Sequence, residues 1–255
     1  MSSTPSNAPP LPARGSAAAA PAAPLFTPRF LLLLATQATY GCVYSAFLLL
    51  PKYLARELDA GPDAIGWVMA AYVAGGLLVV PWVARALDRQ RRGPLMVGGA
   101  LLGAATALGF LAVTRVGALL IALSLLLGVA FVLVFNAGGT LATDLAPPAR
   151  LGQALGFWGL ATLSTNAIAP VTLEPVADRW GWDAVFVLSA LGAMAAALLA
   201  AVGTRGEPAP AATAPTTRSL RGRLSGDRGR VLLAAALTGL GLGTLFTFVV
   251  PFGCV

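Results

Sequence analysis

Two charged side chains after the second long apolar stretch could form an ion pair across one turn of a helix. They are Asp88 and Arg92, in the segment ARALDRQRRG at positions 84–93. Residues four apart share a helix face, where opposite charges attract each other. We therefore expect a latch at the membrane surface. The alternative is that the arginines of this segment only anchor the topology, namely Arg85, Arg89, Arg91 and Arg92.

A second set of polar residues lies inside the first apolar stretch. Gln37, Tyr40, Gly41 and Tyr44 recur at the spacing of one helix face. An unpaired polar group in hydrocarbon costs free energy, so this face should point toward protein or toward a watery cavity. These side chains could contact a small solute, or they could only form hydrogen bonds between helices.

The sequence offers little for enzyme chemistry. It contains no histidine, and its two cysteines, Cys42 and Cys254, provide neither a disulfide framework nor a metal-ligand spacing. No apolar stretch pairs a nucleophile with a base or holds two acids. We expect no enzyme activity, no catalytic residue, no cofactor and no metal.

Seven apolar stretches dominate the chain. Each is close to the roughly 20 residues that a helix needs to cross about 30 Å of hydrocarbon. None contains Asp, Glu, Lys or Arg, whose charges are costly at the bilayer centre. The sequence therefore predicts an all-α, polytopic transmembrane helix bundle in a lipid bilayer. The seven predicted spans are Phe30–Leu50, Ala64–Ala84, Pro94–Val113, Val116–Gly139, Leu155–Leu173, Ala184–Val202 and Val231–Pro251.

The distribution of cations gives the direction in which the chain threads the membrane. Of the 17 lysines and arginines, Lys52, Arg56, Arg115 and Arg179 fall on one side, and all the others fall on the opposite side. The positive-inside rule places the arginine-rich side in the cytoplasm. We expect a multi-pass protein of the inner (plasma) membrane with a cytoplasmic N-terminus. Because these loops explain the net charge of +7, nucleic acid is not an expected partner.

Composition divides the chain into four parts. Residues 1–28, rich in Pro, Ala and Ser, predict a disordered cytoplasmic tail rather than a signal peptide, because repeated prolines make a poor apolar signal region. Residues 29–203 predict a six-helix transmembrane bundle. Residues 204–230 join the segment EPAPAATAPTT to an arginine-rich run and predict a basic cytoplasmic linker. Residues 231–255 then begin an incomplete second bundle.

An internal repeat supports this division. The segment ALDRQRRG follows the second span and VADRWG follows the fifth, so Asp88-Arg89 and Asp178-Arg179 correspond if three helices are repeated as three helices. An odd number of spans separates the two copies, which therefore face opposite sides, as an inverted repeat requires. Chance is the alternative, because the same dipeptide also occurs at 227–228.

Residues 29–255 resemble the major facilitator superfamily. The segment at 84–93 is similar to the family signature G-x-L-A-D-R-x-G-R-R. Asp88, Arg89 and Arg92 match it, whereas Ala84 and Arg91 stand where the family usually has glycines. Further agreement lies in Gly128, in the segment DLAPPAR at 144–150, and in Gly181-Trp182 with Phe186.

The resemblance implies two six-helix bundles, each a 3+3 inverted repeat. It also implies a secondary active transporter that moves a small organic solute by alternating access, more as efflux than as uptake. A conformational latch would lie at the cytoplasmic side, formed by Asp88, Arg89, Arg92 and Asp144. Residues that contact the small-molecule substrate would surround a central cavity, and the candidates are Gln37, Tyr40, Tyr44, Asn136 and Asn166.

Two questions about this function stay open. The chain ends as its seventh helix finishes, so we expect a truncated chain. The alternative function is therefore a truncated, non-transporting membrane protein or a helper subunit that packs on another membrane protein. Proton coupling is the second question, because proton-driven exporters of the family carry an arginine where this chain has Ser124, and segment 169–173 keeps only the proline of their G-P-x-x-G signature. Glu174 is the nearest acid, and we expect it at the outer interface.

Overall fold

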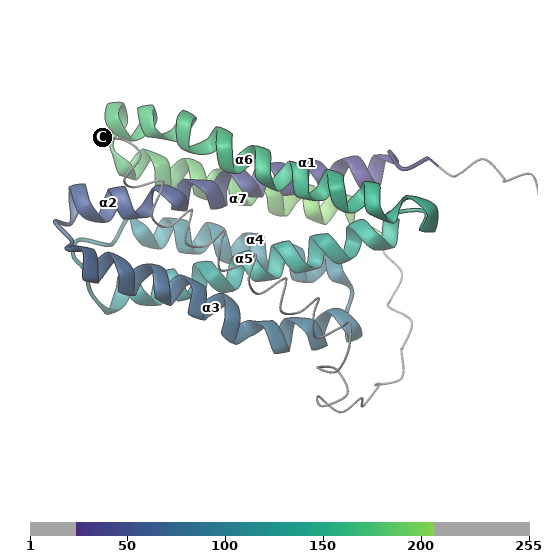
Figure 1. Cartoon of the computed structure of the whole chain (residues 1–255), viewed down its shortest axis with the longest axis horizontal. Coiled ribbons are helices and arrows are strands. Elements are labelled where there is room, and N and C mark those ends of the chain that lie inside the picture. The colour runs from purple at the N-terminus through teal and green to yellow at the C-terminus, as the bar shows by residue number, and fades with distance from the viewer. Residues whose placement is uncertain (1–23, 207–255) are drawn as a thin grey trace, which may run out of the picture.

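A computed structural model describes residues 24–206 as a bundle of helices joined by short turns (Figure 1). It confirms the prediction of an all-α bundle for the first six of the expected spans. The seventh span, the linker beyond Gly206 and most of the N-terminal tail lie outside the described residues. In chain order the elements are α1 (Pro28–Ala46), η1 (Phe47–Leu49), α2 (Leu50–Glu57), α3 (Pro62–Arg89), α4 (Arg92–Phe110), α5 (Ala118–Leu145), η2 (Pro148–Arg150), α6 (Leu151–Trp180) and α7 (Trp182–Gly203).

The local sequence explains where the first membrane-length helical segment, or rod, begins. It also shows where the α-helix gives way to a 3₁₀ segment. Thr27 caps α1, because its side chain accepts a hydrogen bond from the Phe30 backbone nitrogen, and Pro28 occupies the first turn, where a missing N–H costs nothing. The 3₁₀ segment η1 then interrupts the rod, and Pro51 lies in the first turn of α2. The three elements together form one span of 30 residues, Pro28–Glu57.

Helix α6 is the least apolar of the membrane-length helices. Within residues 24–206, length and composition qualify five rods to cross a membrane, and α6 is not among them. It has 30 residues, but Ser164, Thr165 and Asn166 in its middle lower its hydropathy. It ends at Gly181, whose φ of 81° lies in the left-handed region that glycine adopts without strain.

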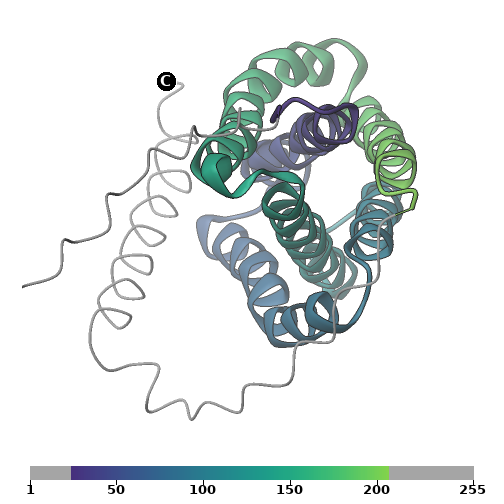
Figure 2. The ribbon, with the colours of Figure 1, turned by 90° about the vertical axis from the view of Figure 1, so that its right-hand side faces the viewer.

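The helix pairings follow the expected inverted repeat. If the first three rods are exchanged with the last three, α1 takes the place of α5, α3 that of α6 and α4 that of α7. The most extensive pairings map onto themselves under this exchange: α3 with α5 becomes α6 with α1, α4 with α5 becomes α7 with α1, and α4 with α7 is unchanged. Seen end-on in Figure 2, α1 and α5 lie between α3 and α6 on one side and α4 and α7 on the other.

Helices α3 and α5 cross with their backbones in close contact. A Cβ added at Gly75 would overlap the carbonyl oxygen of Leu125, and one added at Gly128 would overlap the carbonyl oxygen of Tyr72. Small residues at helix crossings in membranes allow this approach, and packing then replaces the hydrophobic effect as the source of association. Gly128, which the family resemblance singled out, therefore sits where no side chain fits.

Replacing Gly128 with alanine should destabilise the bundle, because backbone atoms cannot move aside as a flexible side chain can. We expect Gly128→Ala to lower the free energy of unfolding by about 1–3 kcal/mol. Thermal unfolding of the purified protein in detergent, followed by circular dichroism, measures this loss. Gly98→Ala is the matched control, because a Cβ there meets nothing within 4 Å. Equal melting temperatures for the two variants would contradict the close crossing.

Candidate functional site

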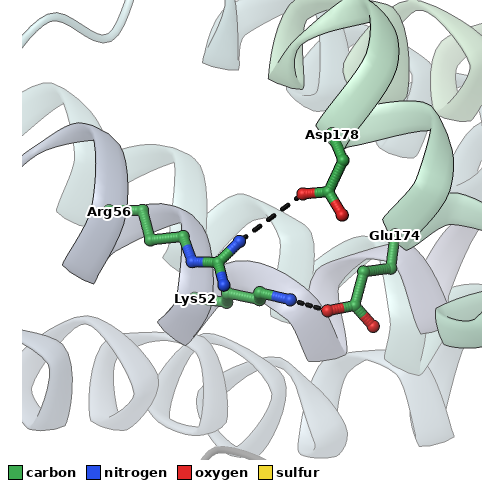
Figure 3. A network of polar contacts seen from close by, with 4 residues as sticks. All are labelled: Lys52, Arg56, Glu174 and Asp178. Carbon is green, nitrogen blue, oxygen red and sulfur yellow. Dashed lines mark hydrogen bonds and ion pairs between the residues drawn. The ribbon is translucent and has the colours of Figure 1, made fainter. Parts of the chain in front are cut away.

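Two ion pairs join α2 to α6 at the end of the bundle where α3 begins (Figure 3). Lys52 pairs with Glu174, and Arg56 pairs with Asp178 at 3.5 Å between Nη1 and Oδ1. Each helix contributes two residues one turn apart, so the pairs follow one another along the α2–α6 interface. We call these four residues the outer ladder, because the predicted topology places this end of the bundle outside the cell.

The two pairs of the outer ladder differ in their exposure to solvent. The side chains of Lys52 and Glu174 are 24% and 34% exposed, whereas those of Arg56 and Asp178 are 57% and 61% exposed. Water screens exposed ion pairs, and such pairs contribute about 0.2–1 kcal/mol. The pair formed by Lys52 and Glu174 is therefore the stronger contributor. Glu174, the acid that sequence analysis singled out, has a cationic partner here.

At the opposite end of the bundle, one ion pair joins α4 to α5. Arg92, the first residue of α4, places its Nε atom 3.1 Å from Oδ2 of Asp144, near the end of α5. The structure thus brings together two of the four predicted latch residues. Within residues 24–206, Asp88 and Arg89 form no ion pair and are exposed in the last turn of α3.

The expected pairing of Asp88 with Arg92 is not formed, and helix geometry gives the reason. Helix α3 ends at Arg89, and Gln90 and Arg91 have extended backbone conformations before α4 begins. The two charged residues consequently lie on different helices, so their spacing of four does not place them on one face. Whether the four residues act as a latch stays a prediction.

The α1–α6 interface carries hydrogen bonds between side chains inside the bundle. Gln37 donates from Nε2 to Oγ1 of Thr162 at 2.8 Å, and Ser45 donates from Oγ to Oδ1 of Asn166 at 2.8 Å. Gln37 and Asn166 are predicted substrate contacts. Both form hydrogen bonds between helices, which is the alternative role that the sequence left open. Sequence reasoning missed Ser45 and Thr162. Ser45 lies four residues after Gly41 and Thr162 four before Asn166, so helical spacing from these residues was the available signal.

The other predicted contact residues lie in three different surroundings. Tyr40 is 2% exposed, and its hydroxyl lies against Gly103 of α4, inside the bundle. Tyr44 stacks on Phe131 of α5, with 4.4 Å between ring centroids. Asn136 is exposed on α5 and donates from Nδ2 to the Val132 carbonyl oxygen of its own helix at 2.9 Å. Within residues 24–206, no three His, Cys, Asp or Glu side chains are grouped to hold a metal ion.

Exchanging the charges of Lys52 and Glu174 tests the outer ladder. Lys52→Glu alone should lower the unfolding temperature, because it faces Glu174 with a like charge, and adding Glu174→Lys should restore most of the loss. A double-mutant cycle in detergent should give a coupling energy of about 0.5–1 kcal/mol. The same cycle at Arg56 and Asp178 should give a smaller coupling, since these side chains are more exposed. Additive effects of the Lys52 and Glu174 changes would show that the two charges do not interact.

The chain resembles known proteins in sequence and in fold. The sequence model of the Major Facilitator Superfamily matches residues 29–254. No curated protein matches the chain. A crystal structure of a mutant of the peptide transporter POT, in complex with alafosfalin, superposes with a TM-score of 0.59 at 18% sequence identity. The alignment covers 87% of this chain and 47% of that one, so the chain spans about half the length of the peptide transporter, and the likeness concerns the fold. The chain belongs to the major facilitator superfamily.

Proposed function

We propose that this protein is a secondary active transporter that moves a small organic solute across the membrane by alternating access, outward rather than inward. The described helices would form the first of two bundles. The family match over residues 29–254 carries this proposal, and the inverted pairing of the six rods supports it. In such folds one bundle rocks against the other around a solute held near the middle of the membrane.

Ion pairs at both ends favour movement of this bundle as one body. The outer ladder holds α2 to α6, and Arg92 with Asp144 holds α4 to α5 at the cytoplasmic end. The transition between states would then use charges that the bundle itself leaves without an ionic partner. Within residues 24–206, Asp88 and Arg89 are two such residues, and they lie at the same end of the bundle as the Arg92–Asp144 pair. We therefore assign them the contacts that form and break.

The substrate contacts of this proposal are Gln37, Tyr44, Asn136 and Asn166, with Tyr40 supporting them from the bundle interior. They are uncharged, as are the six predicted spans that the structure describes. Ser124 is buried where proton-driven exporters of the family carry arginine, and it donates to the Leu120 carbonyl oxygen of its own helix. Proton coupling would therefore need a titratable group outside these six spans. Glu174, directly after the fifth span, is paired with Lys52.

The latch assignment predicts a loss of transport when its charges are removed. Asp88→Asn removes a contact that forms and breaks, and Asp144→Asn removes the ion pair beside it. Each should slow solute movement by at least about threefold, since a shift of roughly 0.7 kcal/mol between two states changes their ratio by that factor. Rates are measured for the full-length protein in proteoliposomes with a panel of organic solutes. Asp59→Asn is the matched control, because Asp59 lies in the turn before α3 at the outer end.

Three results would count against parts of this assignment. Normal transport by Asp88→Asn would leave the arginines of segment 84–93 as topology anchors only. Failure of the unmodified protein to move any solute of the panel would favour the helper-subunit alternative. Direction is tested in cells, where deletion of the gene should raise the retention of at least one toxic compound. Lower retention would indicate uptake.

A further inference from the structure

Five aromatic side chains form a connected series across four helices. Tyr72 of α3 lies 6.2 Å from Tyr44 of α1, and Tyr44 lies 4.4 Å from Phe131 of α5, all between ring centroids. Phe131 continues to Phe135 at 5.4 Å, and Phe135 continues to Trp158 of α6 at 6.3 Å. We call these five residues the aromatic row. Helices α4 and α7, on the other side of the bundle, contribute none of them.

The aromatic row is partly open to its surroundings. Phe135 is 36% exposed, and Tyr44, Tyr72 and Phe131 are half-buried. Trp158, 3% exposed, is anchored: its ring lies against Gly138 of α5, where an added Cβ would overlap it. Exposed rings held on a rigid base can stack on a flat ligand without losing much side-chain freedom.

The predicted spans that carry the aromatic row contain no Asp, Glu, Lys or Arg. The ion pairs of the described residues lie at the two ends of the bundle, at the outer ladder and at Arg92 with Asp144. An anion would face the negative faces of the rings, which repel it. A cation would be attracted to these faces, but this contact recovers only part of the hydration that a cation without an acidic partner loses. An uncharged ring system pays neither cost, so the aromatic row favours neutral ligands.

Two buried polar atoms beside the row lack a hydrogen-bond partner among residues 24–206: Oε1 of Gln37 and Nε1 of Trp158. The Thr162 hydroxyl donates to the Trp158 carbonyl oxygen at 3.1 Å, so it accepts from Nε2 of Gln37, which fixes the orientation of the amide. Unmade hydrogen bonds of this kind in a protein interior call for an explanation. One atom is an acceptor and the other is a donor, so a neutral group that both donates and accepts, such as a carboxamide, matches their chemistry.

We propose that the aromatic row is the subsite for an uncharged, planar aromatic solute that carries a carboxamide or similar polar group. This proposal rests on the transport function proposed above. The ring of the solute stacks at Phe135. Its polar group then pairs with Gln37 and Trp158 after α6 shifts relative to α1 and α5, because both atoms are closed to solvent in this structure.

Three probes that share one ring but differ in charge test this proposal. They are naphthalene-2-carboxamide, 2-naphthoate and 2-naphthyl-trimethylammonium, and their binding to the full-length protein in lipid nanodiscs is measured by equilibrium dialysis. Empty nanodiscs give the background for partition into lipid. We expect the carboxamide to bind at least about tenfold more tightly than either ion, since an uncompensated charge costs more than one tenfold step. Equal or tighter binding of the anion or the cation would overturn the assignment of a neutral solute.

Removing one ring tests the place of binding. Phe135→Leu should weaken carboxamide binding about three- to tenfold, the range expected for one lost ring contact, and Phe135→Tyr should preserve it. Phe157→Leu is the matched control, because Phe157 is 37% exposed on α6 but contacts Phe26 rather than the row. Wild-type affinity in Phe135→Leu, or an equal loss in Phe157→Leu, would refute the subsite.

Transport measured in parallel separates this subsite from the proposed function. Carboxamide binding that depends on Phe135, without movement of any solute in proteoliposomes, would reject the transport function and leave the binding site. Transport of other solutes with no carboxamide binding would reject the subsite and leave the transport function.

Discussion

The cost of placing a charge in hydrocarbon shapes this bundle more than any single contact. Six predicted spans in the described part of the chain contain no Asp, Glu, Lys or Arg, because such a charge at the bilayer centre costs about 2.5 kcal/mol or more. Ion pairs are therefore confined to the ends of the bundle, at the outer ladder and at Arg92 with Asp144. The middle must be held by backbone contact and by hydrogen bonds between uncharged groups. This separation leaves the aromatic row without a neighbouring charge.

The two halves of the inverted repeat solve the same packing problem with different chemistry. The α3–α5 pair meets through Gly75 and Gly128, where backbone touches backbone. Its counterpart, the α6–α1 pair, has Gly41 against the hydroxyl of Thr165. It adds two side-chain hydrogen bonds, one on each side of this glycine. One interface is thus held by close backbone packing, whereas the other is polar. Polar groups that can exchange partners make the second interface the better match for the solute contacts proposed above.

The sequence predicted the spans well because hydropathy depends on each segment alone. Helical spacing also identified the polar face of the first span, whereas Gly128 was identified through the family resemblance. The sequence could not predict which neighbour a side chain meets. Lys52 and Glu174 are far apart in the chain and pair only because α2 and α6 end side by side. Likewise, Tyr40 and Tyr44 share a face by spacing, yet Tyr40 contacts Gly103 of α4 and Tyr44 contacts Phe131 of α5. Such partners depend on where the helices cross.

Helix interruptions explain why the outer ladder lies where it does. In the first rod, the 3₁₀ segment η1 and Pro51 precede Lys52, and in α6 the prolines Pro170 and Pro175 flank Glu174. A proline inside a helix removes one backbone hydrogen bond and weakens the helix at that turn. Pro170 and Pro175 therefore weaken α6 near its outer end, and the 3₁₀ segment η1 interrupts the first rod just before α2. The Lys52–Glu174 pair lies at these interruptions and the Arg56–Asp178 pair lies beyond them, so the two pairs tie the outer ends of the rods to each other. The outer ends of α2 and α6 would consequently move together, even if the rods bend at the breaks.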